Sequence, residues 1–483
     1  MQLRRLLHVI GAVVVAVGGT MVAAAVTSFI YQEWRDGWLM LLAAIITMAI
    51  GWATWNRFER PQDLSMKEGF AVVGLTWIAM ALFGTLPFLF TGSISNFIDA
   101  MFETSAGFST TGASVITDLD AMPRGILMWR SLMQWLGGMG VIVLSIAVLP
   151  LLGTGGVALA QAESPGPTPD RLTPRFRETA KRLWWVYVAI TGLEVIFLVL
   201  GEMTLFEAIS HSLTTMSTGG FGTDGSSLGG FSVYSQWVVV VFMIVAGTSF
   251  ALHFRALKDP REYLRSAEFK LYMAIVLGAA FVFAIGTHSG RAIVDVVRDA
   301  IFTSATLITT TGFATADFGL WVPALQVVVF GLMFVGGMAG STGGSVKPYR
   351  LGVLVGAARS DLRRVIHPRG VFVTRLGGET VEDEVVESVQ SFFLLYMFIF
   401  MTGTVLFSMI VQVDGAAFDM VSSASAVASS LGNVGPALSQ LGPSATYIDV
   451  PSAGKMLLSF LMLVGRIEIY PILLLFTREL WRK

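Results

Sequence analysis

The sequence contains no cysteine, so it can hold no disulfide, thiolate zinc site, iron–sulfur cluster or cysteine nucleophile. Its five histidines are scattered with no i, i+4 pair, which argues against a histidine metal site. Charged residues make up only 13% of the 483 positions and the net charge is -1, so no overall field would attract nucleic acid. The chain also lacks a Ser/His pair or an aspartate cluster of the kind a membrane-embedded enzyme needs, and we expect no enzyme activity.

Hydrophobic residues, in contrast, make up 54% of the chain and gather in long runs. A helix needs about 20 apolar residues to cross the hydrocarbon core of a membrane. Ten runs approach this length, and the eighth is too long and too rich in glycine to be one unbroken helix. The runs cover residues 6–29, 38–55, 70–90, 126–149, 183–200, 236–254, 269–286, 322–358, 392–411 and 455–476. The sequence therefore predicts an all-α polytopic membrane protein whose first helix is retained rather than cleaved as a signal peptide.

Four shorter, semi-polar stretches lie between pairs of these runs, at residues 97–110, 205–217, 292–309 and 418–430. Each is too short or too polar to span a membrane, which favours re-entrant helices. If ten helices cross, the clusters of Lys and Arg all fall on one side, which the positive-inside rule makes the cytoplasm. Both termini then lie in the cytoplasm, and all four re-entrant stretches lie on the external side.

The four stretches end alike, which indicates an internal repeat. Each ending contains a glycine that follows small polar residues, and each interval between these glycines holds two long runs. The endings are Ser109-Thr110-Thr111-Gly112-Ala113, Ser217-Thr218-Gly219-Gly220-Phe221, Thr309-Thr310-Thr311-Gly312-Phe313 and Gly432-Asn433-Val434-Gly435-Pro436. The fourth is the most divergent, and its register rests on Gly435 alone. One Thr-Thr-Gly triplet is ordinary loop sequence, but four copies at matching positions favour a shared role.

These endings have a composition suited to binding cations. Irregular backbone inside a membrane is tolerated only where it is buried in protein or lines a wet cavity, so four such segments most simply share a pore. Backbone carbonyls and threonine hydroxyls can replace the water shell of a cation without formal charge. Glycine permits the torsions that aim carbonyls inward, and the negative ends of the short helices add a modest attraction. The pattern predicts a pore for small monovalent cations.

The four endings, the helix, pore-loop, helix units around them and the glycine-rich break in the eighth run resemble the Trk, Ktr and HKT superfamily of potassium transporters. Two additional runs at the N-terminus make the chain look most like the bacterial Trk membrane subunit, TrkH or TrkG. The resemblance implies potassium uptake across the bacterial inner membrane, with K+ as the transported ion and no covalently bound cofactor. It also implies a homodimer and regulation by a cytoplasmic, nucleotide-binding partner of the TrkA type.

On this resemblance the chain divides into four pore repeats with a pseudo-fourfold arrangement around one pore, preceded by a two-helix extension at residues 1–60. The repeats cover residues 69–150, 183–255, 269–358 and 389–483, and cytoplasmic linkers are expected at 151–182 and 359–388. Four prolines between positions 163 and 174 favour an irregular structure for the first linker.

Carried over position by position, the family's selectivity filter falls on the four endings, where K+ would bind. The filter residues are Thr110, Thr111, Gly112, Thr218, Gly219, Gly220, Thr310, Thr311, Gly312, Asn433, Val434 and Gly435. The family's intramembrane gate falls on Gly336, Gly337, Gly340, Ser341, Thr342, Gly343 and Gly344, and its pore arginine on Arg466. Asn433 and Val434 depart from the Thr-x-Gly pattern, which weakens the expectation of four equivalent ion sites.

Three alternatives stay open on the sequence alone. Arg466 lies deep in the last run, where it either faces the pore, snorkels or pairs with Glu468, although positions i and i+2 point to different helix faces. The glycine-rich stretch is either a hinge in the ion path or a close-packing patch of small residues. The alternative function is a proton- or sodium-coupled potassium transporter, for which the dispersed residues Glu103, Glu194 and Glu468 are the acidic candidates.

Overall fold

The computed structural model describes residues 3–58, 65–148, 172–288, 290–416 and 418–482. Apart from a hairpin of two short strands, β1 (Arg375–Leu376) and β2 (Glu379–Thr380), the regular structure of these residues is helical. Six of the described helices are long and apolar enough to cross a membrane, and one bent pair would add a seventh. The prediction of an all-α polytopic membrane protein is therefore confirmed.

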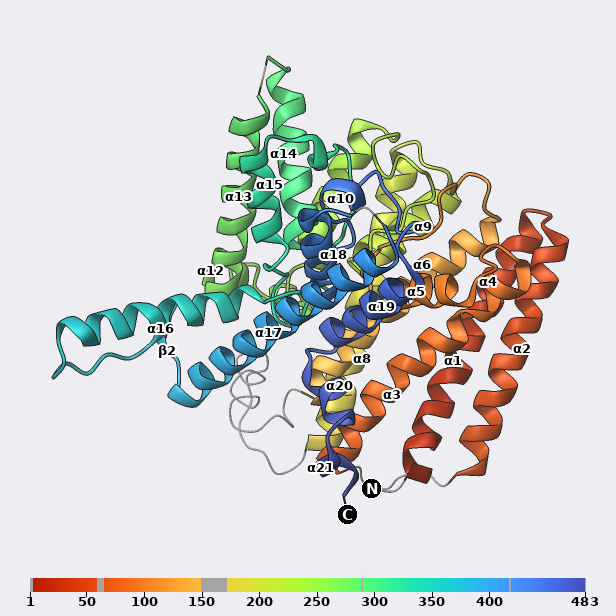
Figure 1. The fold of residues 1–483 in the computed structure, drawn as a ribbon, viewed down its shortest axis with the longest axis horizontal. Coiled ribbons are helices and arrows are strands. Elements are labelled where there is room, and N and C mark those ends of the chain that lie inside the picture. The colour runs from red at the N-terminus through yellow and green to blue at the C-terminus, as the bar shows by residue number, and fades with distance from the viewer. Residues whose placement is uncertain (1–2, 59–64, 149–171, 289, 417, 483) are drawn as a thin grey trace.

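The N-terminal extension is an antiparallel helix pair at one edge of the molecule, α1 (Leu3–Ile30) and α2 (Trp34–Arg57) (Figure 1). Small residues let the two backbones approach closely, since a Cβ added to Gly11 would lie 2.6 Å from the backbone nitrogen of Trp55. Helix α1 also packs against the first repeat, which joins the extension to the rest of the fold.

The helices can be grouped by the four predicted repeats: each group begins with a long helix and contains a shorter helix of 12–16 residues that is followed by a loop and by one or more further helices. Repeat 1 contains α3 (Met66–Gly84), α4 (Leu86–Thr91), the short α5 (Phe97–Phe108) and α6 (Arg124–Val148). Repeat 2 contains α8 (Leu172–Leu200), the short α9 (Leu205–Met216), α10 (Val233–Ala246), α11 (Phe250–Ala256) and α12 (Glu262–Arg265). Repeat 3 contains α13 (Ala267–Thr287), the short α14 (Ile293–Ile308), η2 (Phe318–Leu320), α15 (Pro323–Leu332) and α16 (Pro348–Ile366). Repeat 4 contains α17 (Asp383–Val413), the short α18 (Met420–Gly432), η3 (Ser439–Leu441), α19 (Ser452–Arg466), α20 (Tyr470–Leu475) and α21 (Arg478–Trp481).

The four short helices begin and end close to the stretches that the sequence predicts. Side-chain caps explain three of their starting points. Asn96 accepts from the N–H of Ile98 at 2.8 Å before α5, and Asp419 accepts from the N–H of Ser422 at 2.6 Å before α18. Thr204 forms a capping box with the third residue of α9.

Three of the predicted spans are broken in the structure, whereas the division of 70–90 into α3 and α4 at Thr85 leaves one continuous apolar span, Lys67–Thr91. Residues 236–254 form α10 and α11, which meet at 99°. Residues 455–476 form α19 and α20, because Glu468 and Ile469 between them have φ of 58° and 68°, outside the helical range. Residues 322–358 are split between α15 and α16, as the glycine content of that run predicts. The prediction of unbroken helices at 236–254 and 455–476 was therefore wrong.

The two predicted linkers have different outcomes. Most of the segment 151–182 lies outside the described residues, which resume in α8. The segment 359–388 is partly helical, because α16 continues to its end at Ile366 and α17 already begins at Asp383. In Figure 1, α16 and the hairpin that follows it project from one side of the molecule.

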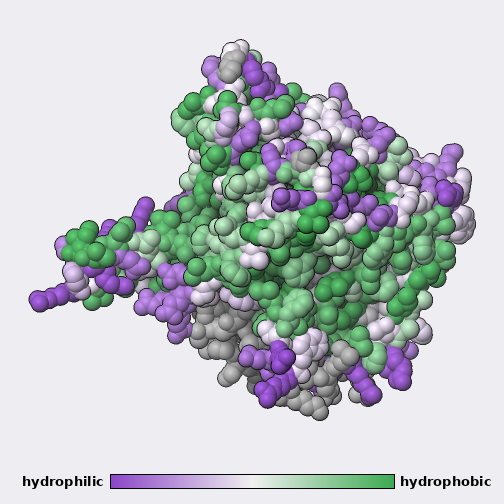
Figure 2. Space-filling view, in the orientation of Figure 1, coloured by the Kyte–Doolittle hydropathy of each residue, from purple (hydrophilic) through white to green (hydrophobic). Residues whose placement is uncertain are grey.

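The surface has the polarity of a protein that sits in lipid. Hydrophobic residues cover the middle of the face shown in Figure 2, and hydrophilic residues gather mainly toward its upper and lower ends. Large apolar side chains point outward from long helices, among them Phe281 on α13 and Leu394 and Phe398 on α17. Lipid, rather than water, is the solvent that suits this belt.

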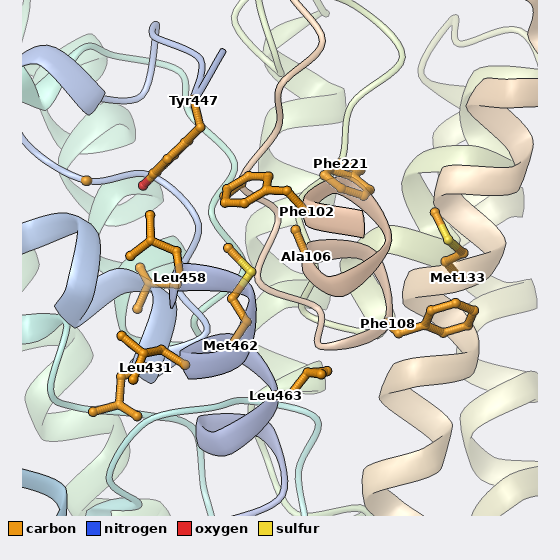
Figure 3. Packing of buried hydrophobic residues seen from close by; sticks show 14 of the residues in the cluster. Phe102, Ala106, Phe108, Met133, Phe221, Leu431, Tyr447, Leu458, Met462 and Leu463 are labelled. Atoms are coloured by element: carbon orange, nitrogen blue, oxygen red, sulfur yellow. The ribbon is translucent and has the colours of Figure 1, made fainter. Parts of the chain in front are cut away.

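The interior is a packed apolar core in which the first and last repeats meet. Phe102 and Ala106 of α5 lie against Leu458 and Met462 of α19 (Figure 3). The ring of Tyr447, from the loop before α19, lies with its centroid 5.4 Å from that of Phe102, at a tilt of 34°. Repeats 1 and 4 are therefore neighbours, as a closed arrangement of four repeats requires.

Candidate functional site

The four loops that follow the short helices, here called the pore loops, are residues 110–112, 218–220, 310–312 and 433–435. Their first residues are all left-handed: Thr110, Thr218, Thr310 and Asn433 have φ of 54°, 54°, 57° and 55°. In each loop the second N–H bonds back to a carbonyl in the last turn of its helix, at 2.8–2.9 Å, which is the Schellman type of helix ending. The fourth loop thus has the register that Gly435 predicts, with Asn433 at the place of the threonines.

This conformation is unusual for threonine. A β-branched residue with positive φ is a rare outlier, and such strain persists only where the surrounding structure imposes it. Three threonines share the same outlier conformation at equivalent places in three repeats. Strain of this kind clusters at functional sites, so the repetition marks the pore loops as the candidate site.

The third residue of each pore loop is a glycine, and the four glycines close a ring. Gly112, Gly220, Gly312 and Gly435 have φ of 81°, 75°, 86° and 103°. A Cβ added to Gly112 would collide with the carbonyl oxygen of Gly219, and one on Gly220 with that of Thr311. A Cβ on Gly312 would lie 2.5 Å from the carbonyl oxygen of Val434, and one on Gly435 would lie 2.5 Å from that of Thr111. Each glycine therefore lies against the middle residue of the next loop, in the closed order 1, 2, 3, 4, 1.

The side chains of the pore loops are mostly held by neighbouring groups. Thr111 Oγ1 lies 2.6 Å from Ser109 Oγ, and Thr311 Oγ1 lies 2.7 Å from Thr309 Oγ1. Asn433 Nδ2 donates to Thr111 Oγ1 at 3.0 Å, which links the fourth loop to the first. Thr110 Oγ1 is buried and has no hydrogen-bond partner among the described residues. The amide oxygen Oδ1 of Asn433 is likewise buried without a partner among the described residues. The oxygens that remain free around the ring are therefore chiefly backbone carbonyls, together with the hydroxyl of Thr110 and Oδ1 of Asn433.

The field at the ring favours a cation although the loops carry no carboxylate. The C-terminal ends of all four short helices face the loops, and each end carries about half a negative charge. Among the described residues, no group of three His, Asp or Glu side chains could hold a metal ion. The arrangement suits a weakly held monovalent cation rather than a tightly bound divalent metal.

A loop between α15 and α16, residues 333–347, lies against the inner ends of the pore loops and is here called the intramembrane loop. All seven predicted gate residues belong to it: Gly336, Gly337, Gly340, Ser341, Thr342, Gly343 and Gly344. Its N–H at Gly344 donates to Thr310 Oγ1 at 2.7 Å, and its Thr342 hydroxyl donates to the carbonyl of Met216 at 3.0 Å. Gly344 also packs against the carbonyl of Gly432. The loop thus contacts repeats 2, 3 and 4 next to the ring.

Two buried cations lie at this loop. Lys347, the last residue of the loop, donates its Nζ to the carbonyl of Gly343 at 2.6 Å, and Arg466, the last residue of α19, is 3% exposed. One guanidinium nitrogen donates to the carbonyl of Thr342 at 2.6 Å, and another donates to the carbonyl of Gly137 at 3.1 Å. Glu468 pairs instead with Arg350 at 2.5 Å, so the alternative of an Arg466–Glu468 ion pair is wrong. Arg466 therefore joins the intramembrane loop to repeat 1.

The three acidic candidates for ion coupling do not meet. Glu103 pairs with Arg130 at 2.8 Å, and Glu468 pairs with Arg350. Glu194 is buried on α8, next to Thr215 of α9. Among the described residues, none of these three carboxylates forms a hydrogen bond with a pore loop, and they form no relay.

Comparison of the four repeats in the sequence did not identify two polar residues of α6, Gln134 and Arg130, that contact the second pore loop and the residues directly after it. Gln134 Nε2 donates to the carbonyl of Gly219 at 2.7 Å, and Arg130 donates to the carbonyl of Gly222 at 3.2 Å. The available signal was their place inside the apolar run 126–149, because polar residues at membrane depth are costly and usually functional.

Comparison with known proteins agrees with this geometry. The family model for TrkH, described as a cation transport protein, matches residues 37–277 and 264–483. The Trk system potassium uptake protein TrkH of Halomonas elongata is 36% identical over 493 residues and is covered in full, as is this chain. TrkG of Escherichia coli K12 is 32% identical over 491 residues, with 100% of this chain and 99% of that protein covered. The crystal structure of the potassium transporter TrkH from Vibrio parahaemolyticus superposes with a TM-score of 0.90 at 34% identity over the full length of both chains.

The match extends over the full length of the chain in both sequence and fold, which is enough to assign the family. The chain is a multi-pass membrane transporter and belongs to the TrkH family of cation transport proteins.

Proposed function

We propose that this protein takes up potassium through a channel-like pore along the axis of the four pore loops, with those loops as the selectivity filter. The observation that carries the proposal is the closed ring, in which each loop glycine lies against the middle carbonyl of the next loop. Four carbonyls around one axis can replace the water shell of K+. Relatives from Halomonas elongata and Escherichia coli are named potassium uptake proteins, which supports K+ as the ion.

The filter acts through neutral oxygens. An anion would meet the carbonyl oxygens and the negative helix ends, whereas a monovalent cation gains from both. Divalent cations dehydrate reluctantly and usually need carboxylate ligands, which the pore loops lack. Conduction needs binding that is strong enough for entry and weak enough for release, and uncharged ligands meet both needs.

The gate in this proposal is the intramembrane loop with Arg466. The loop lies at the inner side of the ring and has few helical hydrogen bonds of its own, so it can move as a unit without unfolding a helix. Arg466 holds the loop in place by donating a hydrogen bond to the carbonyl of Thr342, and it places a positive charge beside the ion path. Moving the loop and releasing this contact would open the path and lower the electrostatic barrier to K+.

The setting of the transporter is also proposed. Its apolar belt and its relatives favour the bacterial inner membrane, and the start of α1 lies at the same end of the molecule as α21 in Figure 1. The positive-inside rule makes that end cytoplasmic. A homodimer and a TrkA-type nucleotide-binding subunit complete the assembly. Binding of a purified TrkA-type subunit at micromolar concentration tests the partner, and no binding would contradict it.

A proton- or sodium-coupled mechanism has less support. Coupling ordinarily uses carboxylates that face the transport path. Glu103 and Glu468 are instead held in ion pairs with Arg130 and Arg350. Coupling would then have to depend on Glu194, whose burial behind α9 gives it no direct contact with the ring.

The test is potassium flux in liposomes that contain only this protein. An imposed K+ gradient should drive uptake that continues when the pH and Na+ gradients are both set to zero. Uptake that stops without one of those gradients would contradict a channel-like pore and support coupling.

A further inference from the structure

One pore loop differs from the others in having no side chain at its middle position. The middle residues are Thr111, Thr311 and Val434 in loops 1, 3 and 4, and Gly219 in loop 2. The backbone conformation does not require a glycine at this position. Gly219, unlike its neighbour Gly220, does not have a positive φ, so a residue with a side chain could adopt the same backbone torsions. Another cause must explain why loop 2 has no side chain there.

The space that a side chain would fill is occupied by Gln134 from α6. A Cβ added to Gly219 would collide with the Cδ and Oε1 atoms of Gln134. The Gln134 side chain is fully buried, and both ends of its amide are used. Its Nε2 donates to the carbonyl of Gly219 at 2.7 Å, and its Oε1 accepts from the N–H of Phe221 at 3.1 Å.

Among the described residues, no side chain from another repeat donates in this way to the middle carbonyl of loop 1, 3 or 4. Thr111 and Thr311 brace their own loops through the hydroxyls of Ser109 and Thr309, at 2.6 Å and 2.7 Å. Loop 2 has Ser217 at the matching place. Its hydroxyl donates to the carbonyl of Leu213 in its own helix, as that of Thr309 does to Ala305, but position 219 offers it no second hydroxyl. In loop 2, therefore, a neighbouring repeat supplies the brace that loops 1 and 3 supply for themselves.

We propose that Gln134 is a positioning residue for ion selectivity: it fixes the orientation of the Gly219 carbonyl in the filter ring, in place of the threonine that loop 2 lacks. Arg130 adds to the same brace one turn earlier on α6, where it lies 3.9 Å over the ring of Phe221 and donates to the carbonyl of Gly222. Without Gln134, the backbone at Gly219 can rotate, since glycine has wide torsional freedom. The size of the ring would then vary, and K+ and Na+ would be distinguished less well.

The experiment measures the K+ to Na+ flux ratio per folded molecule in liposomes for four variants. Gln134→Met keeps the volume but removes the donor, and it should lower the ratio by about threefold to tenfold, the effect of one hydrogen bond. Gly219→Thr alone should also lower the ratio, because it displaces Gln134. Combining Gly219→Thr with Gln134→Ala makes room for a threonine beside Ser217, as in loops 1 and 3, and should restore the ratio to within about twofold of the original.

The inference rests on the proposed filter, so Gly220→Ser serves as the fourth variant and separates the two claims. A lowered ratio in Gly220→Ser with an unchanged ratio in Gln134→Met overturns the role of Gln134 and leaves the filter intact. Unchanged ratios in both overturn the filter itself. If Gln134→Met does not fold, the double variant decides: a folded protein with a restored ratio supports the proposal, and an unfolded or unselective one overturns it.

Discussion

Replacing Arg466 with alanine should raise potassium flux, and the structure gives the size of the effect. Arg466 makes two hydrogen bonds, one to the intramembrane loop at Thr342 and one to repeat 1 at Gly137. A hydrogen bond to a charged group contributes about 1.5–3 kcal/mol net. If the loop bond holds the gate closed, its loss shifts the opening equilibrium by about tenfold to a hundredfold, at 1.4 kcal/mol per factor of ten.

The variant should still fold, because both partners of Arg466 are neutral carbonyls. Removing one member of a buried ion pair strands a charge and costs about 3–5 kcal/mol. Among the described residues Arg466 has no carboxylate partner, so its loss strands no charge. We expect a smaller loss of stability, about 1–3 kcal/mol for the carbonyls left without donors.

The assay is K+ flux into liposomes, divided by the amount of folded protein that elutes as a single species on size-exclusion chromatography. Arg466→Lys is the matched control, since it keeps the charge and loses the planar fork. Flux in Arg466→Lys should lie between that of the original protein and that of Arg466→Ala. A well-folded Arg466→Ala protein with unaltered or reduced flux would refute the gating role while leaving the four-loop pore intact.

Two further predictions concern the supports of the pore loops. Arg130→Met leaves the buried carboxylate of Glu103 without its partner at 2.8 Å and should destabilise the protein by about 3–5 kcal/mol. Thermal unfolding in detergent measures this loss, and an unchanged melting temperature would contradict the prediction. Asp419→Ala removes the cap of α18 and should cost about 1 kcal/mol at neutral pH, whereas a cost below the error of unfolding measurements would contradict the cap. Burial alone would raise the pKa of the Asp419 carboxyl, but hydrogen bonds from Ser422 and Ser439 bring this pKa below its ordinary value of 3.8. The stability that the cap contributes is therefore fully present above pH 3.8 and is lost as the pH falls through the lowered pKa.

The sequence predicted the short helices and the pore-loop register because these depend on local signals. Glycine, threonine and asparagine at the loop positions have local conformational preferences, and the capping residues Asn96, Thr204 and Asp419 lie next to the helices they start. Repetition then made the pattern visible, even in the fourth loop where only Gly435 matched.

Contacts between repeats could not be predicted in the same way. The partner of Glu468 is Arg350, more than a hundred positions away, and no local pattern pairs them. The breaks after Ala246 and Arg466 interrupt apolar runs whose hydropathy looks continuous. Gln134 was passed over because its role depends on an empty position, Gly219, in another repeat.

The central claim is that the ring of loop glycines and carbonyls selects potassium, and the most direct test is the K+ to Na+ flux ratio of Gly312→Ser in liposomes. Gly312 has φ of 86°, a torsion that residues with a side chain rarely adopt, and it lies against the carbonyl of Val434. A Cβ at this position would therefore strain the backbone and also displace part of the ring. Gly278→Ser is the matched control, because Gly278 lies in α13 with nothing within 4 Å of an added Cβ. We expect Gly312→Ser, and equally Gly112→Ser and Gly220→Ser, to lose selectivity while Gly278→Ser keeps it. An unchanged flux ratio in all three ring variants would contradict the account.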